Sequence, residues 1–217
     1  MNEEKQNTLF TLDGDIETIT PAKQNLLKLT AVQKQALQLF NKKAREVLLV
    51  GGSRSGKTFI IIYKQLLLAA KHPGSRHLIA RYRFNHVKHA VWADTLRKLI
   101  RLAFTDEKIK WKRTDYYIEF DNGSQIWLAG LDDKDRTEKI LGMEFLTVFL
   151  NEASQISYEA YTTIKTRLAQ RIQGMPPCFL LMLTRPAKSI GFTRYSSKTS
   201  SPKPTSISKQ TDLYGCR

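Results

Sequence analysis

Cysteine, acidic residues and long apolar runs are all scarce in this chain of 217 residues. Its two cysteines, Cys178 and Cys216, form neither a metal-ligand spacing nor a disulfide framework, which fits a reducing cytoplasm. The longest apolar runs fall far short of the roughly 20 residues that cross a bilayer, so we expect no membrane partner. The N-terminal stretch MNEEKQNTLFTLDGD is polar and acidic, unlike a secretory signal peptide.

The shortage of acidic residues leaves a strong positive charge. Lys and Arg number 35 against 20 Asp and Glu, which gives a formal net charge of +15. Such a surplus favours a polyanionic partner, and nucleic acid is the first candidate. A basic surface without a specific partner would give the same count. The length allows one domain with a core, or one domain and a tail.

Short apolar runs alternate with amphipathic stretches along most of the chain. The runs predict buried strands at 46–50, 76–82, 145–150 and 178–184. A helical period predicts helices after Thr30 and over 57–71, 86–104 and 158–173. In DYYIEFDNGSQIWLAGL, Asn122-Gly123 predicts the turn of a β-hairpin. This alternation indicates an α/β fold with a mostly parallel central sheet and helices on both faces.

The stretch VLLVGGSRSGKTFI places a glycine-rich loop between a predicted strand and a predicted helix. Residues 51–58 fit the pattern G-x-x-x-x-G-K-[ST] of a phosphate-binding loop. The glycines let several backbone N–H groups converge on one anion, and the helix directs its positive dipole end to the same place. Lys57 can reach the β- and γ-phosphates, and the Thr58 hydroxyl can bind Mg²⁺. The predicted nucleotide contacts are Gly51, Gly52, Ser53, Arg54, Ser55, Gly56, Lys57 and Thr58.

A second strand end supplies the acid that this chemistry needs. The run LTVFLNEAS leads to Asn151 and Glu152, and Glu152 can polarise the attacking water as a general base. Asn151 can accept a hydrogen bond from a magnesium-bound water, but it brings no charge, so metal affinity should be weaker than with aspartate. The alternative is that Asn151-Glu152 only caps the following helix.

The glutamate beside the metal position points to the additional-strand, catalytic-glutamate (RecA-like) branch of the P-loop NTPases. We expect the amide-lined cradle before Lys57 and the carboxylate of Glu152 to face one triphosphate from adjoining strand ends.

Several blocks, in order, resemble the ATPase domain of the large terminase subunit of tailed bacteriophages, over about residues 28–188. LTAVQ at 29–33 resembles the adenine motif of that family, and GGSRSGKT carries the arginine that terminases place inside the loop. LIARYRFNHVKHAVW is similar to its strand-then-helix block, with Arg81 at the strand end. The most specific block is GSQIWLAGLDDKDRTEKILGMEFLTVFLNEAS, with a similar hairpin strand, acidic pair, Gly-x-Glu-Phe step and Walker B strand.

The resemblance implies an ATP-hydrolysing motor that packages viral DNA. ATP and its Mg²⁺ would be bound by Lys57, Thr58 and Asn151. Glu152 would activate water, and Gln33 would read adenine. Arg54 would sense or stabilise the γ-phosphate, to which an arginine can make a bidentate contact. The alternative for Arg54 is a side chain that only faces solvent.

The resemblance also implies partners. They are double-stranded DNA contacted without sequence preference, the small terminase subunit, the portal protein of the procapsid, and further copies of the chain in a ring. The implied place of action is the cytoplasm of a bacterial host.

The chain departs from the family after CFLLMLT at 178–184. A coupling motif of the type Thr-x-Asn-Pro is expected there, but LTRPAKS keeps Thr184 and Pro186 and lacks the asparagine. From 189 to 217, 11 of 29 residues are Ser or Thr, and the apolar periodicity is lost. Residues 184–217 hold seven Lys and Arg and one acid, or +6, so no acidic cluster of the family's nuclease domain is present.

The sequence thus predicts three parts: a lead-in at 1–28, a terminase-like ATPase domain at 29–188, and a basic tail at 189–217 without a nuclease domain. We interpret the tail as disordered, or as the frameshift product of a longer prophage gene, which the downstream reading frames would test. Two other functions stay open. A helicase-like ATPase is disfavoured because a second motor domain is lacking. A prophage remnant that binds nucleotide or DNA with little turnover is favoured by Asn151 and the altered coupling motif.

Overall fold

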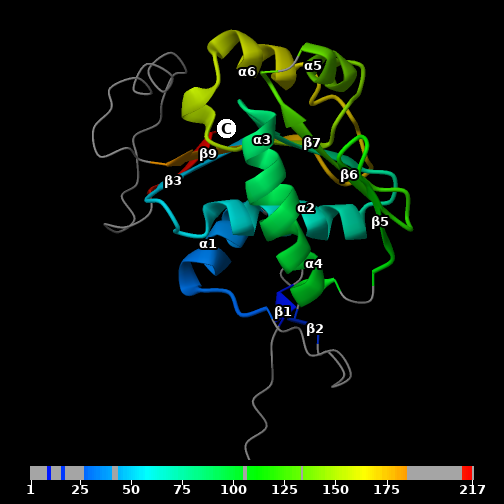
Figure 1. Cartoon of the computed structure of the whole chain (residues 1–217). Coiled ribbons are helices and arrows are strands. Elements are labelled where there is room, and N and C mark those ends of the chain that lie inside the picture. The colour runs from blue at the N-terminus through cyan, green and yellow to red at the C-terminus, as the bar shows by residue number, and fades with distance from the viewer. Residues whose placement is uncertain are drawn as a thin grey trace, which may run out of the picture.

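An eight-stranded sheet with helices on both faces forms the centre of the computed structural model, which describes residues 9–10, 16–17, 27–40, 44–104, 107–132, 134–184 and 212–216 (Figure 1). The strand order is β10 (Asp212–Cys216), β3 (Glu46–Gly51), β9 (Cys178–Thr184), β8 (Thr147–Leu150), β4 (Arg76–Arg81), β7 (Gln125–Gly130), β6 (Tyr117–Phe120) and β5 (Ile109–Lys112). The five strands from β3 to β7 in this order are parallel, and the other pairs are antiparallel. The mostly parallel α/β fold predicted from the apolar runs is confirmed.

Strand β9 lies between β3, which leads into the glycine-rich loop, and β8, which leads to Glu152. This inserted strand is the feature that defines the additional-strand branch, so that prediction is confirmed. The expectation of adjoining strand ends was wrong. Because β9 occupies the position between them, the loop and Glu152 flank a third strand end instead of meeting directly.

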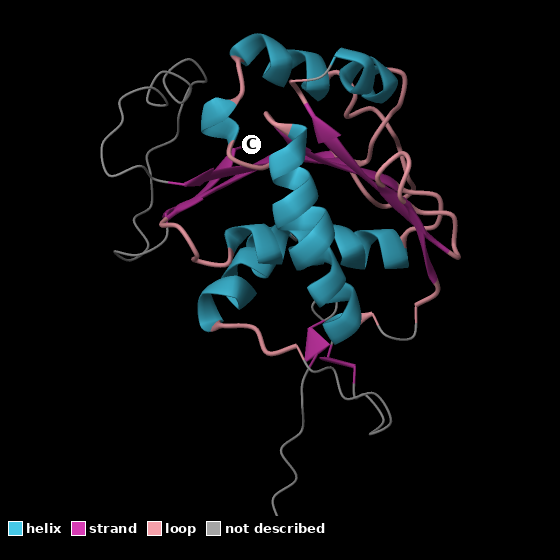
Figure 2. Ribbon diagram, in the orientation of Figure 1, coloured by secondary structure: helices cyan, strands magenta, loops and turns pink. Residues whose placement is uncertain are grey.

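Helices cover the sheet in two layers (Figure 2). One layer consists of α1 (Ala31–Phe40), α2 (Lys57–Lys71), α3 (Phe84–Val87), η1 (Lys88–Thr95) and α4 (Leu96–Ala103). The other consists of α5 (Lys134–Leu141), η2 (Ala153–Gln155) and α6 (Tyr158–Lys165). The helix expected over 86–104 is present as the consecutive segments α3, η1 and α4, of which η1 is π-helical. None of the described helices has the length and apolar character of a bilayer-crossing segment.

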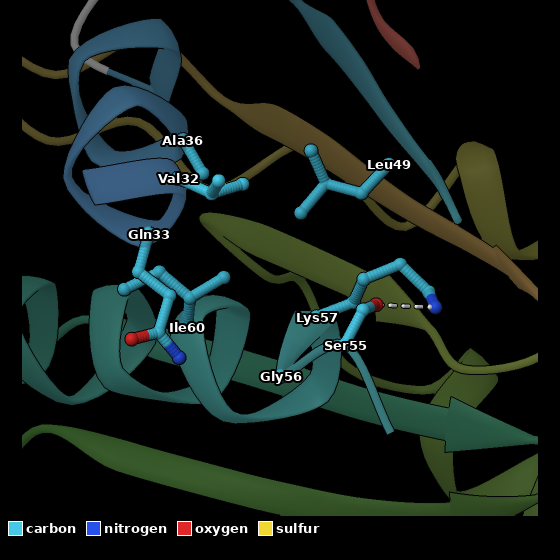
Figure 3. Close-up of a pocket in the computed structure, with 8 residues that line it drawn as sticks. All are labelled: Val32, Gln33, Ala36, Leu49, Ser55, Gly56, Lys57 and Ile60. Carbon is cyan, nitrogen blue, oxygen red and sulfur yellow. Dashed lines mark hydrogen bonds between the residues drawn. The ribbon is translucent and has the colours of Figure 1, made fainter. Parts of the chain in front are cut away.

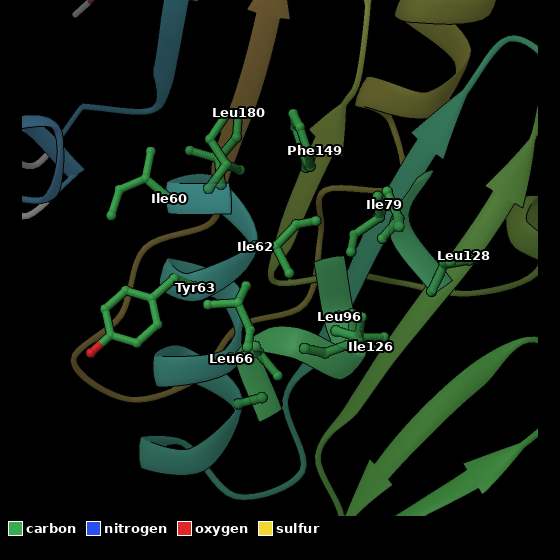
Figure 4. Packing of buried hydrophobic residues seen from close by; sticks show 14 of the residues in the cluster. Ile60, Ile62, Tyr63, Leu66, Ile79, Leu96, Ile126, Leu128, Phe149 and Leu180 are labelled. Carbon is green, nitrogen blue, oxygen red and sulfur yellow. The ribbon is translucent and has the colours of Figure 1, made fainter. Parts of the chain in front are cut away.

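Helix α2 is buried around most of its circumference, as expected for a helix that is apolar on nearly every side. Ile60, Ile62 and Leu66 pack against β4, β8 and β9 through Ile79, Phe149 and other strand side chains (Figure 4). The N-terminus of α2 is therefore held firmly at the carboxyl edge of the sheet, where the glycine-rich loop ends.

A polar network is buried between α2 and the sheet. His77 is fully buried, with Nδ1 2.7 Å from Thr147 Oγ1 and Nε2 2.9 Å from Ser75 Oγ. Gln65 of α2 donates to Thr147 Oγ1 at 3.0 Å. Ser75 Oγ donates to Ser124 Oγ at 3.2 Å, and Ser124 Oγ donates to the His72 carbonyl at 2.8 Å. The network ties α2, β4, β7 and β8 together at the edge opposite the loop.

A close contact fixes the start of α3 beside the end of β7. A Cβ placed on Gly130 would lie 2.5 Å from Phe84 Cβ and 2.6 Å from the Phe84 nitrogen. Asp132 Oδ1 accepts a hydrogen bond from that Phe84 N–H at 3.0 Å. Only glycine allows this approach, so the chain that follows Arg81 and leads into α3 has a defined path.

Several predicted boundaries differ from the structure. α6 ends at Lys165 instead of 173, because the following backbone pairs with the segment before β8: Phe145 N–H donates to Arg167 C=O at 2.8 Å. Helix α5 and strand β5 were not predicted. Within the lead-in, β1 (Leu9–Phe10) pairs with β2 (Ile16–Glu17). In the predicted tail, Asp212–Cys216 forms β10, whereas 189–211 and 217 lie outside the described residues.

Candidate functional site

The loop between β3 and α2 has the backbone of a tight anion-binding turn. Gly56 has φ 78°, a left-handed conformation that glycine adopts without strain, and Arg54 shares that region with φ 60°. α2 then begins at Lys57 with no side-chain cap, so its first N–H groups are directed into the loop. The loop sits where the sequence predicted it.

Lys57 closes this loop from inside. Its Nζ donates to the carbonyls of Gly51 at 2.9 Å and Gly52 at 2.6 Å. It also donates to Ser55 Oγ at 3.0 Å (Figure 3). The side chain is only 6% exposed, and this burial lowers the pKa of its amino group, while the negative charge of Glu152 raises it. Gly51 also pairs with Thr184 at the end of β9, so the ammonium lies at the carboxyl edge of the sheet.

Gln33 lies against the loop and also caps its own helix. Its Oε1 accepts from the Thr30 N–H at 3.0 Å, and Thr30 Oγ1 accepts from the Gln33 N–H at 3.3 Å. This reciprocal pair is a capping box, which the sequence analysis missed although the pattern Thr-x-x-Gln was visible. The amide nitrogen Nε2 would lie 2.7 Å from a Cβ on Gly56. Gln33 therefore links α1 to the glycine-rich loop.

A small pocket between α1 and the start of α2 is the place where a base could lie beside Gln33. Figure 3 shows its lining residues, which come from α1, β3, the loop and α2. They are Val32, Gln33, Ala36, Leu49, Ser55, Gly56, Lys57 and Ile60. Val32, Ala36, Leu49 and Ile60 supply its apolar side chains, and Gln33, Ser55 and Lys57 supply its polar ones.

Glu152 is held at the end of β9. Thr184 Oγ1 donates to Glu152 Oε1 at 2.6 Å, and the Thr184 N–H donates to Oε2 at 3.3 Å. Glu152 has φ 57°, a strained conformation for a non-glycine residue, which turns its side chain toward β9. The sequence placed Thr184 in a coupling motif but gave no sign that it would bind the glutamate.

The helix-cap alternative for Asn151-Glu152 is not supported. Glu152 makes no side-chain cap bond to η2, and Ser157 is the residue that caps α6, through Oγ, which accepts from the Ala160 N–H at 3.2 Å. Asn151 is 2% exposed, and its Oδ1 has no hydrogen-bond partner among the described residues. A buried acceptor without a donor fits a site that receives one from elsewhere.

These residues fit a hydrated Mg²⁺ without forming a dense metal cage. The orphaned Oδ1 of Asn151 can accept from a metal-bound water, and Mg²⁺ usually keeps several waters. Thr58 Oγ1 instead donates to Met182 Sδ at 3.2 Å, a weak acceptor that the hydroxyl can give up by rotation. The described residues contain no group of three or more His, Cys, Asp or Glu that could hold a metal.

The remaining predicted contacts lie on the open side of the loop. Ser53 and Arg54 are exposed, and Gly52 is exposed with nothing within 4 Å of the position that a Cβ would take. Arg54 thus has the solvent-facing position of the alternative stated above, and contact with a γ-phosphate would require its side chain to turn inward. Its role as a phosphate sensor stays a prediction.

Comparison with known proteins gives one family. The phage terminase large subunit family matches this chain over residues 42–202. The fold is similar to the large terminase of a thermophilic bacteriophage, with a TM-score of 0.62 and 14% identity over 72% of this chain and 39% of that one. Structures of that terminase include complexes with ADP and ATP-gamma-S.

Two further structures share the fold. The ATPase domain of the Thermus phage P74-26 large terminase has a TM-score of 0.57 and 19% identity, over 77% of this chain and 69% of that domain. The large terminase of bacteriophage HK97 has a TM-score of 0.57 and 14% identity, over 76% of this chain and 35% of that one. The chain spans about two-fifths of the length of the thermophilic phage terminase. No curated protein matches it in sequence.

Proposed function

Because the chain belongs to the phage terminase large subunit family, we propose that it hydrolyses ATP and uses the energy to move double-stranded DNA into a viral procapsid. The observation that carries this proposal is the position of Glu152. Its carboxylate is bound to Thr184 at the end of β9, and Thr184 pairs with Gly51, the first residue of the loop. Lys57, bonded to the Gly51 carbonyl, and Glu152, bonded to Thr184, therefore lie at the ends of two paired strands, and this supports the proposed roles of phosphate ligand and general base.

In the proposed reaction the triphosphate replaces the bonds that Lys57 now makes to the loop. The ammonium turns from the Gly51 and Gly52 carbonyls to phosphate oxygens, and the N–H groups at the start of α2 bind the same anion. Glu152 accepts a proton from water, whose oxygen bonds to the γ-phosphorus as the bond to the bridging oxygen breaks. The products are ADP and inorganic phosphate.

Mg²⁺, when bound, neutralises charge on the β- and γ-phosphates. Thr58 and Asn151 are the residues that would hold it, Asn151 through a bound water. Gln33 would contact the adenine, because its Nε2 is next to Gly56 and its side chain lines the pocket.

The positive charge of the chain supports DNA as the partner. Exposed cations lie on two neighbouring elements, α4 with Lys98 and Arg101, and β5 with Lys112. The two elements are in contact, since the guanidinium of Arg97 lies 5.0 Å from the centre of the Trp111 ring. Cations of this kind bind phosphates without reading bases. The small subunit, the portal protein and a ring of copies are proposed on the family relationship alone.

A nucleotide- or DNA-binding protein with little turnover is the second candidate, and Asn151 favours it. A neutral amide holds a hydrated Mg²⁺ less strongly than a carboxylate would, because it lacks the Coulombic attraction. The two candidates share the binding site and differ only in the rate of phosphate release.

The test is steady-state phosphate release, with and without double-stranded DNA, for the unchanged chain, Glu152→Gln and Glu159→Gln. Glu159 is exposed on α6 and makes the same charge change away from the loop. We expect Glu152→Gln to lower the rate by about 10²–10⁴-fold while nucleotide binding persists. Glu159→Gln should retain the normal rate.

No turnover by the unchanged chain, with normal nucleotide binding, would favour the binding-only candidate. A Glu152→Gln rate within about threefold of normal would refute Glu152 as the base. DNA binding should weaken steeply as salt is raised, and binding that is indifferent to salt would count against a translocating motor.

A further inference from the structure

Two buried atoms without partners lie at neighbouring strand ends. The described residues contain three buried side-chain N or O atoms that lack a hydrogen-bond partner, and two of them are Arg81 Nε and Asn151 Oδ1. β4 and β8 pair in parallel through Ala80 and Leu150, and the Asn151 N–H donates to the Ala80 carbonyl at 2.8 Å. Arg81, the last residue of β4, therefore lies beside Asn151, the first residue after β8. A buried donor and a buried acceptor left unpaired side by side indicate a ligand position.

Strand periodicity places both residues on the face of the sheet that α2 covers. On β8, Thr147 bonds to Gln65 of α2, and Asn151 is four residues further on. On β4, His77 bonds to the same Thr147, and Arg81 is four residues further on. Because side chains alternate with a period of two, Arg81 and Asn151 share the face from which α2 presents Lys57 and Thr58.

The sheet order sets the distance that a ligand must cover. Starting from the loop strand β3, the order is β9, β8 and β4, and neighbouring strands are about 4.8 Å apart. Arg81 is thus about 14 Å across the sheet from β3 but only about 4.8 Å from Asn151. A triphosphate that extends from the loop toward Asn151 would bring its terminal phosphate within reach of a long arginine side chain.

The charges at this edge make an anion the fitting ligand. Asn151 is neutral, and the nearby carboxylate of Glu152 is bonded to Thr184. None of the ion pairs within the described residues involves Arg81. The guanidinium of Arg81 thus has no carboxylate partner at this edge. Beside it, the neutral amide of Asn151 takes the place where an aspartate would usually bind Mg²⁺ through water. Together they leave an excess of positive charge beside the terminal phosphate.

We propose that Arg81 contacts the terminal phosphate of the bound nucleotide and, with Asn151 as its neutral neighbour, makes triphosphate binding less dependent on Mg²⁺. This inference rests on the proposed nucleotide site. The Nε and terminal amines of Arg81 donate to phosphate oxygens, in the charge-assisted geometry that arginine favours. The side chain then supplies charge neutralisation that a metal held by an aspartate would otherwise supply.

The experiment measures nucleotide affinity of the full chain, with Arg81→Gln and the control Arg83→Gln. Arg83 is two residues away in the same strand-to-helix turn, is exposed, and loses the same charge. Fluorescent mant-ATP-γ-S and mant-ADP are titrated in excess EDTA and in excess Mg²⁺. We expect Arg81→Gln to weaken triphosphate binding in EDTA by about tenfold or more, and by less in Mg²⁺. The affinity of Arg81→Gln for the diphosphate should change less than about threefold. The affinities of Arg83→Gln for both nucleotides, in EDTA and in Mg²⁺, should also change less than about threefold.

Three results would overturn the inference. They are an Arg81→Gln affinity within about twofold of normal in EDTA, equal losses for Arg81→Gln and Arg83→Gln, and equal losses for di- and triphosphate. A second variant serves if Arg81→Gln does not fold. Asn151→Asp would pair with Arg81 and repel phosphate, so it should weaken triphosphate binding in EDTA about tenfold and restore it in Mg²⁺. An unchanged EDTA affinity of Asn151→Asp would equally overturn the inference.

The proposed function fails in a different way. If the unchanged chain binds no nucleotide under either condition, both proposals are refuted. If it binds and hydrolyses ATP normally and Arg81→Gln has no effect, only the role of Arg81 is refuted.

Discussion

Acid should destabilise this protein through one buried histidine. Burial, together with the positive charge of His72, lowers the pKa of His77 from 6.5 to about 3. The hydrogen bonds match the neutral ring. Ser124 Oγ donates to the His72 carbonyl and Ser75 Oγ donates to Ser124, so His77 Nε2 carries the ring proton and donates to Ser75 Oγ. In the neutral ring Nδ1 then accepts from the Thr147 hydroxyl, whose oxygen also accepts from Gln65.

The size of the effect follows from the two pKa values. The pKa of His77 is lower in the folded state than in the unfolded chain. Between pH 6.5 and about 3, His77 is therefore protonated in the unfolded chain and neutral in the folded protein. The contribution of neutral His77 to the free energy of unfolding is therefore fully present above pH 6.5 and is lost as the pH falls toward 3. At about pH 5, roughly one and a half units below the unfolded pKa, the loss is about 2 kcal/mol, since each unit corresponds to about 1.4 kcal/mol.

Urea unfolding at a series of pH values from about 8 to about 5 measures this loss. His77→Gln should lower stability near pH 8, since it disrupts the network, but should remove most of the slope between about pH 7 and 5. His86→Gln is the control, because His86 is exposed on α3 and should leave the slope unchanged. If His77→Gln keeps the full slope, or His86→Gln removes it, the assignment of acid sensitivity to His77 is wrong.

Three glycines give further predictions, which thermal or chemical unfolding can check. Gly56→Ala should lower the free energy of unfolding by about 1–2 kcal/mol, because a Cβ is strained at φ 78° and would lie 2.7 Å from Gln33 Nε2. Gly52→Ala, with nothing within 4 Å, should change it by less than about 0.5 kcal/mol, and an equal effect at both positions would contradict this reasoning. Gly130→Ala should cost about 1–3 kcal/mol, because its Cβ would lie 2.5 Å from Phe84 Cβ. Normal stability of Gly130→Ala would show that α3 can move aside.

The central strands were predictable because each is a near-continuous apolar run. EVLLV alternates between buried and partly buried residues, CFLLMLT is buried along most of its length, and both became parallel strands. Asn122-Gly123 marked the hairpin turn for a backbone reason: Gly123 has φ 79°, which the turn requires. At these positions the local composition indicates the same structure as the local backbone geometry, so a single sequence was enough to predict it.

Elements that depend on distant partners were not predictable. The end of α6 is set by the pairing of Arg167 with Phe145, residues far apart along the chain, and no local signal marks it. α5 carries the sequence KDRTEKIL, in which only the last two residues are apolar, so its pattern is weak. The insertion of β9 between β3 and β8 is a fact of strand order, which a single sequence does not encode locally.

In the candidate site, the sequence pointed to the proposed reacting groups but not to their protein partners. Lys57 and Glu152 were proposed from motifs, and their position at one edge of the sheet follows from its parallel strands. The bond from Thr184 to Glu152 joins residues 32 apart and could not be read from spacing. The position of Arg81 beside Asn151 likewise follows from the register of β4 and β8.

These partners determine which groups contribute net binding energy to a nucleotide. Lys57 must give up three hydrogen bonds to the loop before it can bind phosphate. Its net contribution to the binding free energy is therefore the difference between the bonds it forms to phosphate and the bonds it loses to the loop. Thr58 gives up only a weak bond to a sulfur. Arg81 Nε and Asn151 Oδ1 give up nothing, because neither has a partner within the described part of the chain. Equal contacts to the ligand are therefore worth more from Arg81 and Asn151 than from Lys57, which is why substitution of Arg81 is expected to be visible even in the presence of an intact loop.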